Sequence, residues 1–396
     1  MTQDTLFGRQ VGLDVLRGFA ILAMLAVNIQ LYASVWIVAD IPKLQPGFAN
    51  WGNQAVWLLN QTLFSQSGLT LFAVLFGAAL SLGSTRPHGR PAGHWRRLTG
   101  ILVIGLLHAY LFWYGDVLVT LALVAMIVAA AHGMTVRGQV SLGLGLIAFT
   151  GLMLLAGSAM GGLIGNLTDA ASAMGFNPDS MGEIEGLYRE GFIARLSYNM
   201  SLAVQSELMQ MVFMSGRLAG CMLLGMAAVR TGFLTLEWPA RRYGVIAATG
   251  IIAGLLLCGT GAWHALATDF TPAAVLQNRV MQYFGSLALA LGYGSALLLL
   301  CKLDLARMVQ DVLAAVGRMA LSNYLAQTLV MTLLFVGFPG LGQFGQVDQM
   351  GQALLVLTLW VAQAFASVFW LQRYRHGPVE WLLRAVSDGH TPSWRL

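Results

Sequence analysis

The residues of this chain best suited to proton-transfer chemistry are His108 and Asp116, which lie in the run GLLHAYLFWYGD beginning at Gly105. Imidazole takes up and releases protons near neutral pH, and a carboxylate can orient it or bind an acceptor hydroxyl. At about 1.5 Å per helical residue, His108 lies about 16 Å beyond Arg97, near the middle of a roughly 30 Å hydrocarbon core. We predict catalysis or transport at this pair. The alternative is a histidine that only bonds a neighbouring helix.

A second set of polar residues lies on the first apolar segment, where Asp14, Arg17 and Asn28 interrupt an otherwise hydrophobic run. On an ideal helix they fall at about 0°, −60° and −40°, so they form one stripe roughly 20 Å long. An ion pair in hydrocarbon is tolerated only where it faces a bundle interior or a water-filled cavity. The stripe predicts a polar path, and the alternative is an Asp–Arg pair that merely orients the helix.

Further polar residues inside apolar segments are candidates for lining the same path. Arg217 either reaches the membrane interface or neutralises a carboxylate. The segment that begins at Gly317 places two amides one helical turn apart. The predicted lining set is Arg217, Arg318, Asn323, Tyr324 and Gln327.

Arginines near the predicted inner face are candidates for holding a nucleotide-like anion, because guanidinium groups bind phosphate. The string GPVEW beginning at Gly377 predicts a helix start near them. The predicted donor-binding set is Arg90, Arg96, Arg97 and Glu380. The positive-inside rule, by which arginines are enriched on the cytoplasmic side of a membrane, explains these residues equally well.

The elements that position these residues are membrane helices. The chain is 57% hydrophobic and 10% charged, with a mean hydropathy of +0.69, which leaves too few polar residues to coat a soluble globule. At about 20 apolar residues per span, we predict a single all-α transmembrane domain over residues 1–396 with ten helices. The predicted spans are 13–33, 66–83, 98–114, 117–131, 140–161, 209–229, 243–263, 280–301, 317–337 and 351–371.

Charge in the connecting segments predicts the orientation. Of the 22 Lys and Arg residues, sixteen fall in inner segments and four in outer ones when both termini are cytoplasmic, as the positive-inside rule requires. Charges in the outer segment 162–208, including Arg195 and Glu207, are interpreted as a solvated face, with acceptor recognition as the alternative. Membrane topology and anionic headgroups explain the basic balance, so nucleic-acid binding is not expected. No phosphate loop, dinucleotide fingerprint, zinc motif or serine elbow is present.

Several motifs resemble the YeiB-like proteins. They include LDVLRG beginning at Leu13 with Asn28, TLFAVLFG beginning at Thr70, and GLLHAY beginning at Gly105 with Asp116. The strings GRMALSNYLAQ and GPVEW resemble the C-terminal region of that family, domain of unknown function 418, here residues 210–390. The resemblance covers nearly the whole chain and implies a multi-pass protein of a bacterial inner membrane.

The first helix of this family is similar to that of the transmembrane acyltransferases, which include the lysosomal heparan alpha-glucosaminide N-acetyltransferase. That similarity implies acyltransferase-like helices over residues 1–301 and transfer from cytoplasmic acyl-CoA, acetyl-CoA first among them, to an extracytoplasmic sugar or other hydroxyl or amine acceptor. It also implies contact with membrane lipids and a homodimer. The histidine that precedes helix two in the lysosomal enzyme has no counterpart in the string NWGN beginning at Asn50, so His108 would act instead as base or acyl carrier.

In this interpretation Asn28 hydrogen-bonds the thioester oxygen as charge develops there, and Asp14 with Arg17 orders the inner half of the tunnel. Two other interpretations remain open. The same polar path could serve a transporter or lipid-binding channel, with His108 and Asp116 as a proton relay. A non-catalytic membrane scaffold would instead close the path and keep it dry.

Overall fold

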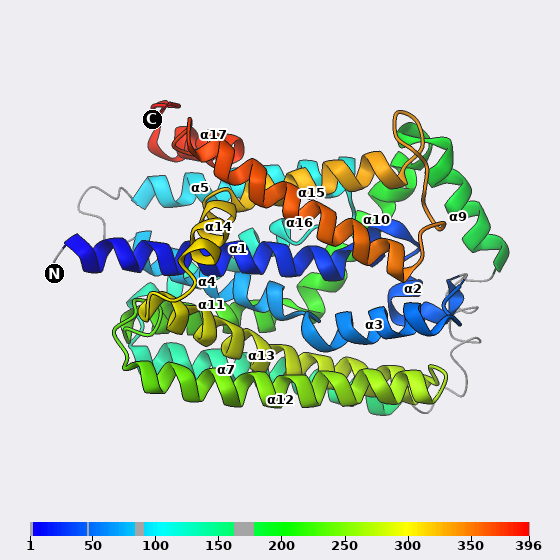
Figure 1. Ribbon diagram of the computed structural model, residues 1–396, viewed down its shortest axis with the longest axis horizontal. Coiled ribbons are helices and arrows are strands. Elements are labelled where there is room, and N and C mark those ends of the chain that lie inside the picture. The colour runs from blue at the N-terminus through cyan, green and yellow to red at the C-terminus, as the bar shows by residue number, and fades with distance from the viewer. Residues whose placement is uncertain (1–2, 46, 84–90, 162–177, 396) are drawn as a thin grey trace.

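The computed structural model describes residues 3–45, 47–83, 91–161 and 178–395, and within these ranges the chain is helical. The only β pairing in them is an isolated bridge between Tyr374 and Arg395. Most of the long helices run along the longest axis of the molecule, and both termini lie at the same end of the bundle (Figure 1). We refer to this end as the terminal end and to the other as the far end.

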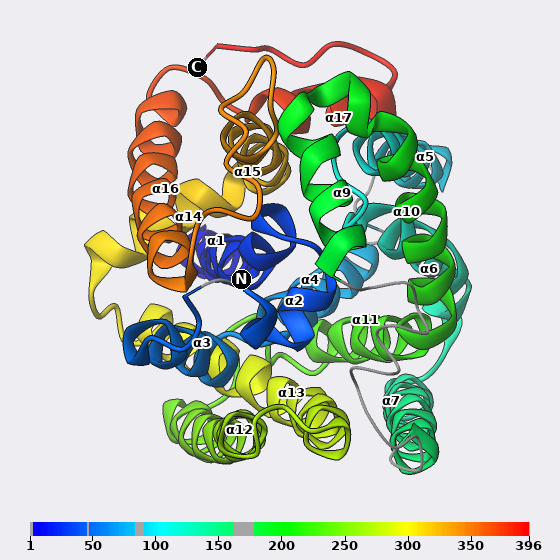
Figure 2. The same ribbon diagram turned by 90° about the vertical axis from the view of Figure 1, so that its right-hand side faces the viewer.

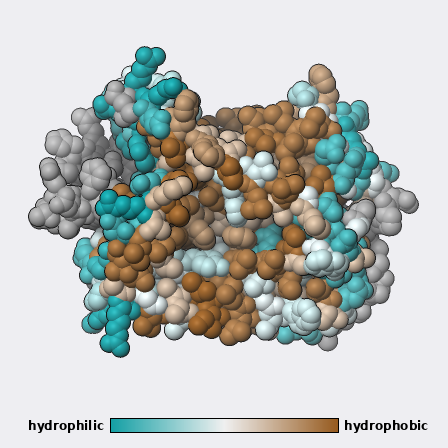
Figure 3. Space-filling view, in the orientation of Figure 1, coloured by the Kyte–Doolittle hydropathy of each residue, from teal (hydrophilic) through white to brown (hydrophobic). Residues whose placement is uncertain are grey.

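Within the described ranges, six helical segments are long and apolar enough to cross a membrane, and a seventh is a pair bent by 59°. An apolar band covers the middle of the face shown in Figure 3, with hydrophilic residues at both ends. The protein is therefore a helical membrane protein. The six segments are Val11–Ala33, Trp51–Leu82, Val136–Ala159, Ala240–Ala267, Pro272–Lys302 and Gln349–Leu371, and the bent pair is Phe192–Phe213 with Ser215–Arg230.

The prediction of ten spans is met in part. Three predicted spans correspond to helices shorter than a bilayer crossing, namely α5 (Pro91–Leu107), α6 (Leu118–Ala129) and α15 (Ala320–Phe335). The predicted sixth span is preceded by a further helix, so that α10 (Phe192–Phe213) meets α11 (Ser215–Arg230) at a break. Residues 192–208, which were predicted to be part of an outer segment, therefore belong to α10, the first helix of this bent pair.

Helix α1 (Gln3–Ala33) lies near the centre of the bundle when the molecule is viewed from the far end (Figure 2). It crosses α14 (Arg307–Arg318) closely, because a Cβ on Gly18 would lie 2.0 Å from the Leu313 carbonyl oxygen and one on Gly317 would lie 1.8 Å from that of Asp14. Small residues allow such backbone approach between membrane helices. The crossing fixes the middle of α1 against α14.

The other helices surround this centre. Helices α7 and α12 lie at the periphery, whereas α5, α6, α9 and α10 form one side of the bundle (Figure 2). Their bounds complete the fold: α2 Ile37–Asp40, α3 Trp51–Leu63, α4 Ser67–Gly83, α7 Val136–Gly161, α9 Pro178–Glu190, α12 Ala240–Ala267, α13 Pro272–Lys302, α16 Gln349–Leu371 and α17 Pro378–Asp388, with short 3-10 turns at Pro42–Leu44 and Ala130–Gly133.

Candidate functional site

The site begins at an interruption between α5 and α6. Helix α5 ends at Leu107, a single π turn covers His108–Phe112, and residues 113–117 are non-helical before α6 begins. Single π turns inside helices are frequent at functional sites. This junction between the predicted spans 98–114 and 117–131 is not at the surface, because Asp116 is 0% exposed and Trp113 is buried. The chain therefore reverses direction inside the protein.

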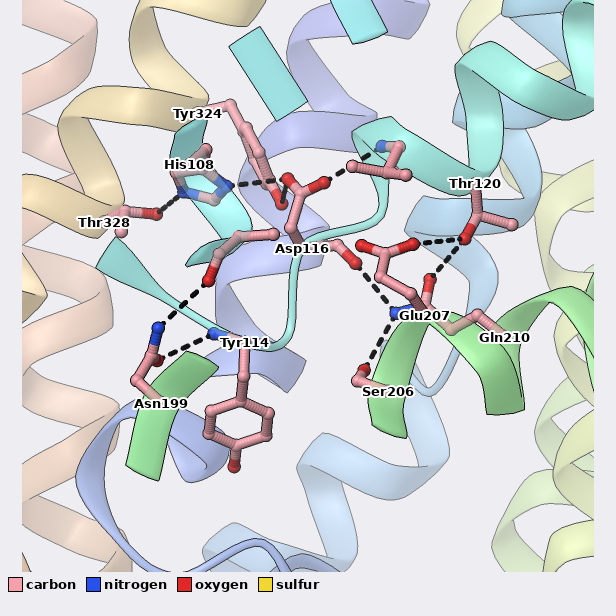
Figure 4. Close-up of polar contacts among 12 residues, drawn as sticks. His108, Tyr114, Asp116, Thr120, Asn199, Ser206, Glu207, Gln210, Tyr324 and Thr328 are labelled. Atoms are coloured by element: carbon pink, nitrogen blue, oxygen red, sulfur yellow. Dashed lines mark hydrogen bonds and ion pairs between the residues drawn. The ribbon is translucent and has the colours of Figure 1, made fainter. Parts of the chain in front are cut away.

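His108 is held on both ring nitrogens. Its Nδ1 lies 2.7 Å from Asp116 Oδ1, and its Nε2 lies 2.8 Å from Thr328 Oγ1 (Figure 4). Tyr324 donates to the same carboxylate oxygen at 3.3 Å, and the Val119 N–H donates to the other at 3.0 Å. His108 is only 3% exposed. A carboxylate, an imidazole and a hydroxyl in this order form the arrangement of an oriented base facing a hydroxyl group.

The distances fit a neutral imidazole in which Nδ1–H donates to the Asp116 carboxylate and the Thr328 hydroxyl donates to Nε2. That hydroxyl oxygen also lies 2.5 Å from the Tyr32 hydroxyl on α1. Four side chains from three parts of the chain thus form one continuous path along which a proton can move.

Helix α10 supports the buried turn. Asn199 donates to two carbonyls of the π turn at 3.0 Å each and accepts from the Tyr114 N–H at 3.1 Å. Gln210 donates to the Asp116 carbonyl at 2.8 Å, and Arg195 donates to the last carbonyl of the π turn at 2.9 Å. Irregular backbone at membrane depth is tolerated only when protein groups satisfy it. These three side chains therefore make the interruption stable.

The interpretation of Arg195 as a solvated charge is wrong, because its side chain is 1% exposed. It lies against the rings of Tyr188 and Phe192. Glu207, from the same predicted outer segment, is half-buried and accepts from Thr120 at 3.2 Å. The error arose because residues 192–208 precede the break between α10 and α11. The predicted sixth span therefore began at residue 209 and left these residues in the outer segment.

Among the described residues no hydrogen bond joins Asn28 to the His108 network. It lines a cavity of about 430 Å³, defined here as the Asn28 cavity, and its side chain has no hydrogen-bond partner in the part of the chain that the structure describes. The cavity wall includes Tyr114, Gly115 and Val117 but neither Asp116 nor His108. The segment 114–117 therefore separates the predicted oxyanion donor from the predicted base.

The inner residues form a separate group at the terminal end. Asp14 and Arg17 make the expected ion pair at 2.7 Å, and both are partly exposed. Arg318 and Arg384 are within electrostatic range of Asp14, and Arg318 donates to the Arg375 carbonyl at 3.2 Å. The predicted polar stripe is thus divided into the Asp14–Arg17 ion pair toward the terminal end and Asn28 farther along α1.

The predicted donor-binding residues are placed differently from one another. The Glu380 carboxylate accepts from the N–H groups of Leu321 at 2.7 Å and Ser322 at 3.0 Å, which caps the first turn of α15 and accounts for this residue without a donor. Arg96 and Arg97 are exposed on the first turns of α5. Arg90 lies outside the described residues.

The polar residues of α15 face two different neighbours, α16 and His108. Asn323 donates to Ser367 on α16 at 3.0 Å, and Gln327 donates to Gln363 at 3.0 Å, so both join neighbouring helices. Tyr324 and Thr328 face His108 instead (Figure 4). Thr328 was not predicted from the sequence, although it lies one helical turn after Tyr324 on α15. Tyr32 lies in the same relation to Asn28 on α1.

Arg217 is buried in the first turn of α11, directly after the break between α10 and α11. It lines a second cavity, which shares Val27, Leu31 and Gln66 with the Asn28 cavity. The structure therefore brings Arg217 and Asn28 to adjoining spaces but leaves both apart from His108.

Comparison with known proteins gives two kinds of match. Residues 228–390 match the family described as "Protein of unknown function (DUF418)". The chain is 33% identical to the uncharacterized protein YeiB of Escherichia coli (strain K12), over 96% of each chain. It is 27% identical to the uncharacterized protein YxaH of Bacillus subtilis (strain 168), over 97% of this chain and 96% of the relative. No solved structure matches it.

Proposed function

This chain belongs to the YeiB-like family, and we propose that it is an acyltransferase that moves an acyl group from cytoplasmic acyl-CoA to an extracytoplasmic hydroxyl or amine. The observation that carries the proposal is His108, held between the Asp116 carboxylate at 2.7 Å and the Thr328 hydroxyl at 2.8 Å. A base oriented by a carboxylate and directed at a hydroxyl is suited to activating a weak nucleophile.

The proposed step balances without a further reagent. The acceptor oxygen or nitrogen attacks the thioester carbonyl, and its proton passes through the Thr328 hydroxyl to Nε2 of His108. The carbon–sulfur bond then breaks, and the imidazolium returns the proton to the CoA thiolate. Asp116 stabilises the imidazolium while it carries the charge. The alternative role for His108 is a transient acyl carrier at Nε2.

Asn28 would stabilise the oxyanion that forms on the thioester carbonyl, since its amide is not engaged by the described chain. This places the acyl carbonyl in the Asn28 cavity, on the other side of residues 114–117 from His108. The proposed reaction therefore requires this segment to shift. The five residues 113–117 between the π turn and α6 are non-helical, and in this shift the Tyr114 N–H and the Asp116 carbonyl would exchange their bonds to Asn199 and Gln210 for others.

We place acyl-CoA entry at the terminal end. Arg96, Arg318, Arg375 and Arg384 gather there around the start of α5 and around α17, and guanidinium groups suit the phosphates of CoA. Through its cap on α15, Glu380 would position α17 and its arginine rather than touch the donor.

The proposed topology has ten spans in a bacterial inner membrane, with α5, α6 and α15 as short spans and both termini in the cytoplasm. The common position of the two termini supports the even number of crossings (Figure 1). The arginines of the terminal end support its cytoplasmic assignment. A homodimer is retained from the family resemblance.

Acyl-CoA binding tests this proposal directly. Thermal stability of the detergent-purified protein is measured with acetyl-CoA, longer acyl-CoAs and free CoA. We expect saturable stabilisation of the wild type and of His264→Gln, whose histidine is exposed on α12. Asn28→Ala should bind a thioester more weakly. Absence of any shift in folded protein contradicts the proposal, and proton-driven solute uptake by liposomes without CoA release would assign the path to a transporter.

A further inference from the structure

Arg217 is a buried cation whose partners are all neutral. It is 3% exposed, and it donates to the amide oxygen of Gln66 and to the hydroxyls of Thr70 at 2.5 Å and Ser286 at 2.8 Å. The Tyr283 ring lies 4.8 Å from its Cζ. Across residues 3–45, 47–83, 91–161 and 178–395, no carboxylate forms an ion pair with it.

An unneutralised charge at this depth is costly, and intramembrane arginines ordinarily pair with an anion. Two other arginines of the bundle show that solution, since Arg17 pairs with Asp14 and Arg279 pairs with Asp40. The three neutral partners orient the Arg217 guanidinium but do not cancel its charge. Among the described residues no carboxylate pairs with Arg217, and the one that lines the same cavity, Asp40, is already paired with Arg279.

The space beside Arg217 is large enough to supply that charge. It is a cavity of about 440 Å³, defined here as the Arg217 cavity, within the size range of small-molecule sites. Arg217 lies in the first turn of α11 after the break at Met214. In broken membrane helices, the N-terminus of the second half adds its positive dipole end to such a site.

The cavity wall also carries hydrogen-bond acceptors that a ligand could use. Asn60 and Gln282 line it, and the oxygens Asn60 Oδ1 and Gln282 Oε1 are buried with no hydrogen-bond partner among the described residues. Buried acceptors of this kind are rare in native proteins and are satisfied by ligand or water. The wall thus offers the unpaired Arg217 cation at one position, the Arg279–Asp40 ion pair at another, and open acceptors on Asn60 and Gln282.

We propose that the Arg217 cavity binds a small organic anion, whose carboxylate or phosphate lies against Arg217 and whose hydroxyl or ammonium groups donate to Asn60 and Gln282. A soluble metabolite and an anionic lipid headgroup share this chemistry. The site needs neither His108 nor acyl-CoA, so it stands independently of acyl transfer.

The test is anion binding to delipidated protein in neutral detergent, without acyl-CoA and at constant ionic strength. Thermal stability and the fluorescence of Trp36, which lines the cavity, are followed during titration with citrate, glutamate, inorganic phosphate and dihexanoyl phosphatidylglycerol. We expect a saturable response to at least one of them. A response confined to phosphatidylglycerol assigns the anion to a lipid headgroup, and a response to citrate, glutamate or phosphate assigns it to a soluble compound.

Arg217→Gln should weaken this binding at least tenfold, whereas Arg217→Lys should retain part of it. Arg230→Gln is the matched control, because Arg230 lies at the other end of α11, is exposed, and donates to the Met134 carbonyl. If Arg217→Gln does not fold, Gln282→Ala should weaken binding several-fold in folded protein. No saturable response in the wild type, or equal binding by wild type and Arg217→Gln, overturns the proposal.

Discussion

The His108 network and the Arg217 cavity are both polar sites beside an interrupted helix, but they differ in what completes them. At His108, every ring nitrogen and carboxylate oxygen has a protein partner, and α10 satisfies the exposed backbone. At Arg217, the charge has only neutral partners, and two neighbouring amide oxygens have none. The first arrangement preserves the geometry of a reactive group, whereas the second leaves room for a ligand.

The two interruptions explain this difference. Helix α10 packs over the turn between α5 and α6 and supplies Arg195, Asn199 and Gln210 to it. At the break between α10 and α11, by contrast, the described residues leave open space, because Met214, the residue at the break, lines both cavities. Helix α10 therefore covers the interruption between α5 and α6, and its own C-terminal end forms the break with α11.

The strongest prediction concerns the closed site. Asp116→Asn preserves the acceptor for the Val119 N–H but removes the charge that stabilises the imidazolium, so we expect acyl transfer to fall by about 10³- to 10⁴-fold. CoA release is measured by thiol titration. Asp348→Asn, which alters the cap of α16 and its hydrogen bond from Asn53 but no contact of the His108 network, is the matched control and should stay near the wild-type rate. A loss of less than twofold in Asp116→Asn would remove His108 from the mechanism.

A second prediction compares the two regions in stability. Asn199→Leu leaves two buried carbonyls and one N–H without partners, so we expect a loss of about 2–4 kcal/mol in the free energy of unfolding. Gln66→Leu at the Arg217 cavity removes one partner in a space that water can enter, and it should cost about 1 kcal/mol or less. Denaturant unfolding in mixed micelles measures both. Equal losses would refute the contrast between a closed and an open site.

Thr328→Val tests whether the hydroxyl carries the proton. We expect about a tenfold or greater loss of acyl transfer, because Nε2 of His108 loses its relay while the side-chain volume stays nearly the same. Thr328→Ser restores the hydroxyl and should recover most of the rate. Failure of the serine variant to exceed the valine variant would indicate a packing role only.

The smallest effect is expected at the terminal end. Arg96→Gln should raise KM for acyl-CoA by about threefold, with little change in kcat, since an exposed arginine contributes a screened attraction to phosphate. The difference from wild type should shrink as salt is added. A change in kcat that is independent of salt would contradict a donor-binding role for Arg96.

The sequence predicted those parts of the molecule that depend on local pattern. The Asp14–Arg17 pair follows from a spacing of three on one helix. His108 and Asp116 were both singled out, but a continuous helix would separate them by about 12 Å. They meet at 2.7 Å because the chain folds back after the π turn. Thr328 and Asn199 were not predicted, because their roles depend on which helices pack together. The position of residues 114–117 between Asn28 and His108 was not predicted either, because the sequence was compared with ideal helices and this segment is not helical.

The measurement that tests the central claim most directly is CoA release by protein reconstituted in liposomes of bacterial lipid. Acetyl-CoA is supplied as donor with hydroxyl and amine acceptors, and wild type is compared with His108→Gln and His264→Gln. We predict release by the wild type and by His264→Gln, and a rate reduced to about 1% or less in His108→Gln. Equal rates in wild type and His108→Gln, or no release from any acyl-CoA by folded wild type, would contradict it.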